Sequence, residues 1–144
     1  MSFNNLDSLY RQVIMDHYKN PRNRGKIEGD VLTVDMNNPT CGDRIQLQLK
    51  VEDGIVSDAK FDGEGCSISM SSASMMTQAI KGKKVEDALA MSKDFSNMML
   101  GEEVEFEDDI AALHGVSKFP ARIKCATLAW KAMEKGVHEQ EENE

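Results

Sequence analysis

The chain has 144 residues, which is the length of one domain and enough to bury a hydrophobic core without disulfide bonds. Hydrophobic residues make up 40% of the sequence and charged residues 29%, so the composition excludes a disordered polar chain and a fibrous protein. Acidic residues outnumber basic ones by 25 to 17, and the net charge of −8 makes nucleic acid a poor candidate partner.

Neither a membrane span nor a secretion signal is predicted. No apolar run approaches the roughly 20 residues needed to cross a bilayer, and the first residues lack a basic segment followed by an apolar stretch. We therefore expect a cytoplasmic protein that has no membrane partner. In a reducing compartment the three cysteines are expected to be metal ligands, nucleophiles or core residues, and not disulfide partners.

An N-terminal helix is predicted over residues 6–19, where apolar side chains recur every three or four positions. Asn20 and Pro21 end this helix, because proline disfavours helical geometry in the residue before it. The polar and basic stretch that follows, up to residue 30, predicts an ordered loop or lid.

A three-stranded antiparallel sheet is predicted next. Residues 31–35 are short and β-branched, and residues 44–51 alternate apolar with polar side chains, as a half-buried strand does. Asp53 and Gly54 supply a hairpin turn before a third strand over residues 55–61. One face of this meander is apolar, so other elements must cover it.

The covering helices are predicted over residues 67–80 and 85–100, which are rich in Ala, Met, Leu and Lys and contain no proline. We expect a break in the second of them near Ser92. An acidic connection over residues 101–109 then leads into a short apolar run that Gly115 stops.

The last helix is predicted over residues 121–135, with Pro120 in its first turn and Gly136 as its cap. Residues 137–144 are predicted to be a disordered acidic tail. The sequence thus predicts a single α+β domain over residues 1–136, in which a three-stranded antiparallel sheet packs against helices.

The cysteines and one aspartate are the residues that can carry chemistry. Cys41 and Asp43 flank Gly42 in a turn before the second strand, so the pair fits a metal site or a plain turn with an Asx-type hydrogen bond. Cys66 follows a glycine-rich junction at the start of a helix, where unpaired backbone amides favour a thiolate. Cys125 lies within the second turn of the last helix, and either Cys66 or Cys125 could instead be a buried core residue.

These side chains are predicted to converge at one end of the sheet. Cys41 and Cys66 flank the two-strand hairpin, and the helix that carries Cys125 must pack against that sheet. Three thiolates and the Asp43 carboxylate would form a tetrahedral site. Zinc is its natural occupant, because zinc accepts sulfur and carboxylate oxygen together, but the spacing is equally compatible with an iron–sulfur site.

Such a site carries net negative charge, which makes its sulfur nucleophilic. Arg122 lies three positions before Cys125 on the same helix face and could offset this charge as a functional residue. The alternative is that it is an ordinary solvent-exposed arginine. His17 is assigned to the polar edge of the first helix, and no histidine is placed for a Cys-His or Ser-His-Asp arrangement. The sequence has no H-E-x-x-H or P-C-x-x-C motif, which disfavours a conventional zinc hydrolase or deaminase.

Four motifs occur in order along the chain: His-Tyr-Lys-Asn-Pro-Arg-Asn from residue 17, Asn-Pro-x-Cys-Gly-Asp from 38, Gly-Cys-x-Ile-Ser-x-Ser-Ser from 65, and Lys-Cys at 124. Their order, over nearly the whole chain, resembles the IscU-like iron–sulfur cluster assembly family. The resemblance implies an α+β fold with a three-stranded antiparallel sheet, and metal ligands at Cys41, Asp43, Cys66 and Cys125.

Within that family the sequence is similar to the SufU branch. Lys124 stands where scaffold-type members have a histidine, residues 119–124 replace the Leu-Pro-Pro-Val-Lys segment that a dedicated chaperone reads, and the acidic connection is long. The SufU resemblance implies a zinc protein that takes sulfur from a pyridoxal-phosphate cysteine desulfurase of the SufS type. In that family picture a histidine of the partner replaces Cys41 on zinc, the Cys41 thiolate accepts the persulfide sulfur, and downstream iron–sulfur assembly proteins receive it.

Three functions are therefore compared. The first is a zinc-dependent sulfurtransferase that accepts persulfide sulfur and stimulates the desulfurase. The second is a scaffold that assembles a [2Fe–2S] cluster on the same ligands. The third is a non-catalytic interaction module in which zinc only holds the fold.

Overall fold

The computed structural model describes residues 2–29, 31–39, 42–106 and 109–142, with the backbone alone for residues 2–7 and 140–142. A helix, three strands and further helices follow one another in the predicted order, which confirms the α+β fold class. The elements are α1 (Ser2–Lys19), β1 (Leu32–Asn38), β2 (Asp43–Glu52), β3 (Ile55–Glu64), α2 (Ser67–Ile80), α3 (Val85–Met99), the 3₁₀ helix η1 (Asp109–Lys118) and α4 (Pro120–Glu142). None of the helices in the described part of the chain is both long and apolar enough to cross a membrane.

The sheet is the predicted antiparallel meander with strand order β1-β2-β3. Leu47 on the central strand pairs with Val34 on β1 and with Phe61 on β3, and all three side chains are buried. Because side chains alternate between the two faces of a strand, this register places the apolar residues of the three strands on one face. That face is the one the helices cover.

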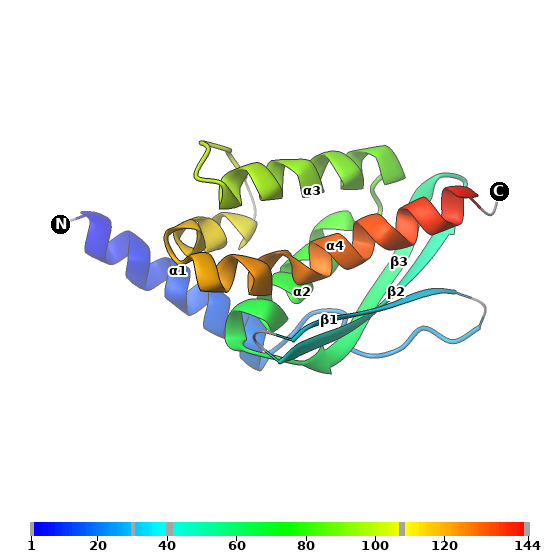
Figure 1. The fold of residues 1–144 in the computed structure, drawn as a ribbon, viewed down its shortest axis with the longest axis horizontal. Coiled ribbons are helices and arrows are strands. Elements are labelled where there is room, and N and C mark those ends of the chain that lie inside the picture. Colours follow the sequence, from blue (N-terminus) through cyan, green and yellow to red (C-terminus); the bar gives the residue numbers. More distant parts are fainter. Residues whose placement is uncertain (1, 30, 40–41, 107–108, 143–144) are drawn as a thin grey trace.

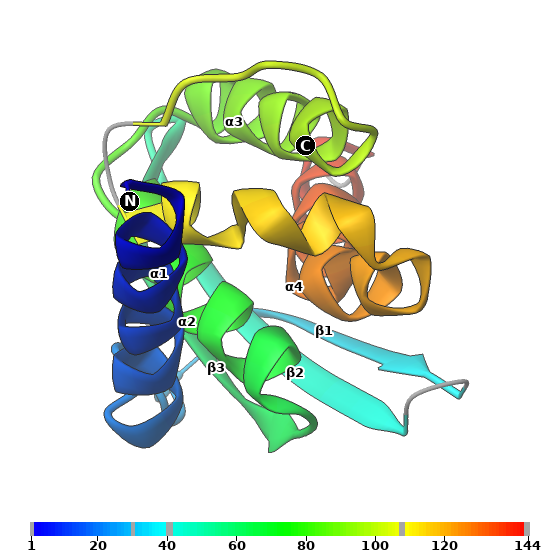
Figure 2. The same cartoon turned by 90° about the vertical axis from the view of Figure 1, so that its left-hand side faces the viewer.

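The helices form layers above the apolar face (Figures 1 and 2). α2 contacts β3, α4 contacts β1 and β2, and the two helices lie side by side, with α1 packed against α2. α3 and η1 lie farther from the sheet, where both contact α4. The boundary between the sheet and the α2–α4 pair is therefore where two strand ends and two helices meet.

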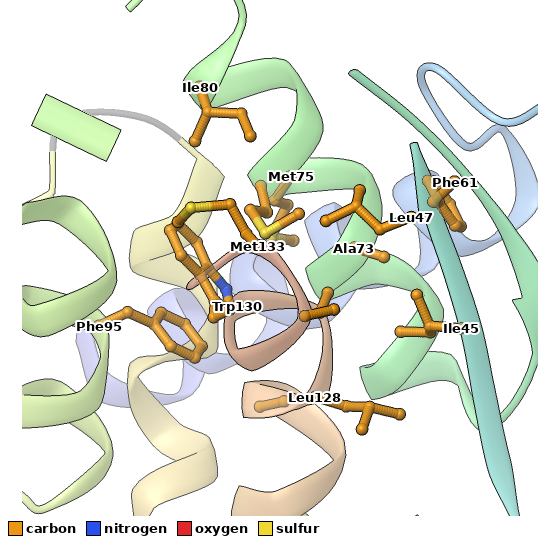
Figure 3. Close-up of a cluster of buried hydrophobic side chains, with 14 of the residues drawn as sticks. Ile45, Leu47, Phe61, Ala73, Met75, Ile80, Phe95, Leu128, Trp130 and Met133 are labelled. Atoms are coloured by element: carbon orange, nitrogen blue, oxygen red, sulfur yellow. The ribbon is translucent and has the colours of Figure 1, made fainter. Parts of the chain in front are cut away.

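The core fills that boundary and extends between α4 and the outer helices (Figure 3). Trp130 on α4 stacks on Phe95 of α3 with ring centroids 4.8 Å apart, and its indole N–H donates to the Ser72 hydroxyl of α2 at 3.2 Å. The Ser72 hydroxyl in turn donates to the Ala126 carbonyl at 2.6 Å. Each large apolar side chain buried here contributes about 1.5–3 kcal/mol, and the polar links fix how far α4 lies along α2.

Residues 23–25, between α1 and β1, are held by backbone hydrogen bonds, as expected for the predicted ordered loop. The Gly25 N–H donates to the Phe61 carbonyl at 2.9 Å, and the Phe61 N–H donates to the Asn23 carbonyl at 3.0 Å. These two bonds pair the segment with the outer edge of β3. An edge strand that is paired in this way no longer offers a template for aggregation.

Two predicted helix interruptions are wrong. α3 continues through Ser92, because this serine is buried at the α3–α4 contact and its hydroxyl donates to the Glu134 carboxylate at 2.6 Å. α4 likewise continues through Gly136 to Glu142. A Cβ at Gly136 would lie 3.0 Å from Cγ2 of Val34 and 3.1 Å from Cδ2 of Leu32, so the glycine allows close helix–sheet packing and is not a cap.

The C-terminal and acidic segments also differ from expectation. Residues 137–142 are helical, where a disordered tail was predicted, and Val137 is buried in the core. The acidic connection is irregular up to Phe106, as predicted, but the apolar run after it forms η1 and passes through Gly115 to Lys118. Burial of Ile110 and Leu113 against the helices sustains this 3₁₀ helix beyond its glycine.

The placement of His17 on a polar helix edge is wrong. Its ring is fully buried, with Nδ1 2.8 Å from the Ser74 hydroxyl of α2 and Nε2 2.7 Å from a carboxylate oxygen of Asp109 at the start of η1. The Ser74 hydroxyl also accepts from the Arg22 N–H at 2.8 Å. Because Ser74 is itself fully buried, this Ser-His-Asp arrangement joins three helices and is closed to a substrate.

Candidate metal centre

Asp43 begins β2 and continues its apolar alternation, since Ile45, Leu47 and Leu49 follow it on the same face. The carboxylate is therefore directed under the helices and is completely buried. Its Oδ1 atom accepts from the Cys66 N–H at 3.0 Å, whereas Oδ2 is buried without a hydrogen-bond partner among the described residues. A buried carboxylate oxygen with no donor is costly, and a cation is the ligand that would satisfy it.

Cys66 is the N-cap residue of α2, at the predicted strand–helix junction. Its sulfur accepts from the Ser69 N–H at 3.4 Å, and the side chain is partly exposed. A helix N-terminus carries positive potential from its unpaired N–H groups, so this position suits a thiolate.

Gly65 and Gly63 allow β3 and α2 to approach β2 closely. A Cβ at Gly65 would lie 2.6 Å from Oδ1 of Asp43, and a Cβ at Gly63 would lie 2.0 Å from the Arg44 carbonyl oxygen. Any side chain at either position would force the Asp43 and Cys66 segments apart. The role of Gly65 was not predicted, although the Gly-Glu-Gly-Cys spacing signalled a special backbone here.

Cys125 reaches the same place from α4. It is completely buried, and its sulfur lies 3.9 Å from the Ala121 carbonyl oxygen of the preceding turn. The neighbouring Ala126 carbonyl accepts from Ser72, so the Cys125 turn is held against α2 by the link that also involves Trp130.

The structure brings Asp43, Cys66 and Cys125 together from three different elements, and one ligand atom of each lies within 4.8 Å of the others. Tetrahedral zinc with Zn–S bonds of about 2.3 Å separates its sulfur ligands by about 3.8 Å. The distances between the three ligand atoms would therefore have to shorten by at most about 1 Å to match those around zinc. The orphaned Oδ2 of Asp43 and the two sulfurs are the donor types that zinc accepts.

Cys41, the fourth predicted ligand, lies outside the described residues. The residues on either side of it do frame its loop. Gly42 has a φ of 73°, in the left-handed region that glycine readily adopts, and its N–H donates to the Asn38 carbonyl at 2.8 Å. Asn38 and Asp43 pair across β1 and β2, so the described ends of this loop lie at the candidate site.

Arg122 lies on the first turn of α4, with its side chain exposed. The pKa of the Arg122 guanidinium is raised above its ordinary value, mainly by the negative charge of Cys66. A hydrogen bond to Cys125 and the charge of Cys125 raise it further. The guanidinium is therefore beside both sulfurs, as the spacing to Cys125 predicts. Its permanent positive charge would offset the negative charge of thiolates at these two positions.

Comparisons with known proteins identify the family. The zinc-dependent sulfurtransferase SufU of Bacillus subtilis is 70% identical over 145 aligned positions, which cover 98% of this chain and 98% of that protein. The iron–sulfur cluster assembly scaffold protein IscU of Streptococcus pyogenes serotype M1 is 44% identical, covering 95% of this chain and 87% of that protein. The crystal structure of a protein described as an assembly scaffold for the SUF system in Fervidobacterium islandicum superposes with a TM-score of 0.83 at 36% identity, covering 88% and 94% of the two chains. The model of the NifU-like N-terminal domain matches residues 9–144, and the chain belongs to this family.

Proposed function

We propose that this protein is a zinc-dependent sulfurtransferase in which Cys41, Asp43, Cys66 and Cys125 hold zinc and Cys41 accepts the sulfur. The observation that carries the proposal is the cluster of Asp43, Cys66 and Cys125, whose ligand atoms lie within 4.8 Å of one another beneath the α2 and α4 helices. The 70% identity to a zinc-dependent sulfurtransferase supports the same chemistry.

Covalent geometry supports Cys41 as the fourth ligand. Only Gly42 separates it from Asp43, and two residues span at most about 7 Å even when fully extended. Zinc, when bound, keeps its thiolate ligands deprotonated at neutral pH. Cys125 is completely buried within α4, so its thiol is poorly placed to meet a partner's persulfide, and Cys41 is the ligand that we assign to the exchange.

The transfer step is a thiol–persulfide exchange. The Cys41 thiolate attacks the terminal sulfur of a persulfide on the donor enzyme, a new S–S bond forms at Cys41, and the donor S–S bond breaks. The donor cysteine leaves as a thiolate, so the exchange needs no external oxidant or reductant. Arg122 stabilises the negative charge that accumulates beside Cys66 and Cys125, while Asp43 stays in place through its bond to the Cys66 N–H.

The donor is proposed to be a cysteine desulfurase of the SufS type, whose turnover this protein stimulates. Residues 110–133 contain four cationic side chains and no acidic one, in a chain of net charge −8. Phe119 is 62% exposed directly before α4, and its carbonyl accepts from the Arg122 N–H at 2.8 Å. An exposed aromatic side chain beside Lys118 and Arg122 suits an acidic partner surface with an apolar pocket.

The sulfur would then pass to downstream iron–sulfur assembly proteins by the same exchange, with Cys41 as the leaving group. We place this activity in the cytoplasm, because a reducing compartment keeps the three thiols available.

The test combines metal analysis of freshly purified protein with a transfer assay. The protein is incubated with desulfurase and cysteine, and mass spectrometry of alkylated peptides locates the added sulfur. We expect zinc in the purified protein, sulfur on Cys41, and loss of both transfer and stimulation in Cys41→Ala. Ser57→Ala is the control, because Ser57 is exposed near the opposite end of β3. Undiminished transfer by Cys41→Ala would refute the role given to Cys41.

A [2Fe–2S] scaffold is the second candidate, favoured by the 44% identity to a protein named as an iron–sulfur cluster assembly scaffold. Anaerobic reconstitution would then give a stable chromophore and cluster transfer to an apo-acceptor. Tightly bound zinc that iron does not displace would exclude it. A purely structural zinc predicts instead that Asp43→Ala unfolds the protein, whereas the sulfurtransferase predicts a folded variant with altered desulfurase stimulation.

A further inference from the structure

Ser69 combines complete burial with an unsatisfied hydroxyl. It lies in the first turn of α2, and its Oγ atom has no hydrogen-bond partner among the described residues. Its backbone N–H is engaged, donating to the Cys66 sulfur at 3.4 Å. The hydroxyl is thus a spare donor in a place from which water is excluded.

The other buried serines of α2 do not share this feature. The Ser71 hydroxyl donates to the Ile68 carbonyl at 3.2 Å, the Ser72 hydroxyl donates to the Ala126 carbonyl, and the Ser74 hydroxyl bonds His17. Helix geometry allows a serine to satisfy itself on a preceding carbonyl, as Ser71 does. The orphaned state of Ser69 is therefore specific to its position.

That position borders the candidate metal centre. The point where a Gly65 Cβ would lie is 3.1 Å from Oγ of Ser69 and 2.6 Å from Oδ1 of Asp43. The two oxygens therefore border the same small space, which exists only because residue 65 is glycine. The Asp43 carboxylate is a strong acceptor at this space, and the Cys66 sulfur already accepts the Ser69 N–H.

We propose that Ser69 is a positioning residue whose hydroxyl donates to the Asp43 carboxylate in the zinc-loaded protein. Oδ1 already accepts the Cys66 N–H and retains a second lone pair, so one oxygen can take both donors while Oδ2 stays directed at the metal. Hydrogen bonds to a ligating carboxylate orient it and tune metal affinity. The inference rests on the proposed function, because it assigns Ser69 to the zinc site.

Three measurements on the full chain test the inference. Zinc affinity is obtained by competition with a chromophoric chelator, the ligand geometry from the absorption bands of the Co²⁺-substituted protein, and the stability of the metal-free protein from thermal unfolding. The variant is Ser69→Ala, and the matched control is Ser71→Ala, which removes a buried hydroxyl from the same helix but away from Asp43.

For Ser69→Ala we expect zinc affinity to fall about 10- to 100-fold, the range typical for lost outer-sphere partners, with shifted Co²⁺ bands. The metal-free variant should melt no lower than the unaltered protein, because the substitution removes an orphaned polar group. Ser71→Ala should leave affinity and Co²⁺ bands unchanged. Unaltered affinity and bands in Ser69→Ala, or equal loss in both variants, would overturn the inference. Failure of the unaltered protein to bind zinc would overturn the proposed function, and this inference with it, so the two failures are distinguishable.

Discussion

Replacement of Gly65 by alanine is the most direct perturbation of the candidate metal centre that leaves every proposed ligand in the chain. The added Cβ would lie 2.6 Å from Oδ1 of Asp43, where ordinary contact begins at 3.4 Å. Its other near neighbours, Cγ of Asp43 and Oγ of Ser69, lie at 3.1 Å. Because Asp43 is completely buried at the start of β2, its carboxylate can yield only by turning away from Cys66.

The magnitude follows from the bond that this rotation breaks. The Cys66 N–H donates to Oδ1 at 3.0 Å, and a hydrogen bond to a charged group contributes about 1.5–3 kcal/mol. Since about 1.4 kcal/mol corresponds to a tenfold change in an equilibrium constant, zinc affinity should fall about 10- to 100-fold. The metal-free protein should lose about 1–3 kcal/mol of stability from the same overlap.

Chelator competition measures the affinity, and urea unfolding with and without zinc measures the stability. The control is Gly115→Ala, because a Cβ at Gly115 meets no atom within 4 Å and should leave both quantities unchanged. If Gly65→Ala binds zinc as tightly as the unaltered protein, the Asp43 carboxylate is not positioned through this contact, and the reasoning is wrong.

Three further perturbations test the fold and the partner surface. Gly136→Ala should lower the free energy of unfolding, measured in urea, by about 1–2 kcal/mol, because overpacking against Val34 and Leu32 outweighs the gain in helix propensity. Increased stability would show that the sheet shifts to accommodate the added methyl group. His17→Ala should lower the free energy of unfolding by about 2–4 kcal/mol, because it opens a cavity and removes the ring's hydrogen bonds to Ser74 and Asp109. The control His114→Ala, at an exposed position, should change it by no more than about 0.5 kcal/mol. Equal effects of the two substitutions would show that the buried hydrogen bonds of His17 do not stabilise the fold. Phe119→Ala should raise the concentration needed for half-maximal desulfurase stimulation about tenfold, with zinc content unchanged; an unaltered titration would exclude Phe119 as a docking residue.

Local sequence patterns were sufficient to predict the helices and strands. The period-two alternation over β2 and the three-to-four spacing over α1 depend on burial of one face, and each pattern is complete within its own segment. The position of Cys66 at the start of α2 could also be predicted, because a glycine-rich junction between a strand and a helix is a local signal.

The errors share a different origin. Ser92 and Gly136 are residues that commonly interrupt helices, yet both lie inside helices here, because each faces a neighbour that local sequence does not contain. His17 was misplaced for the same reason, since its partner Asp109 lies 92 positions away. Propensity is a weak preference of a few tenths to about 1 kcal/mol, and tertiary contacts override it.

By itself the sequence determined the fold class, the strand meander and the short set of residues able to bind a metal, because these follow from periodicity and from the chemistry of side chains. Only the tertiary structure decided which of those side chains meet. The approach of Asp43, Cys66 and Cys125 depends on the absent Cβ of Gly65 and on the Ser72–Trp130 link that sets α4 against α2. Such distances are sums of packing contacts between remote segments, and no pattern within one segment encodes them.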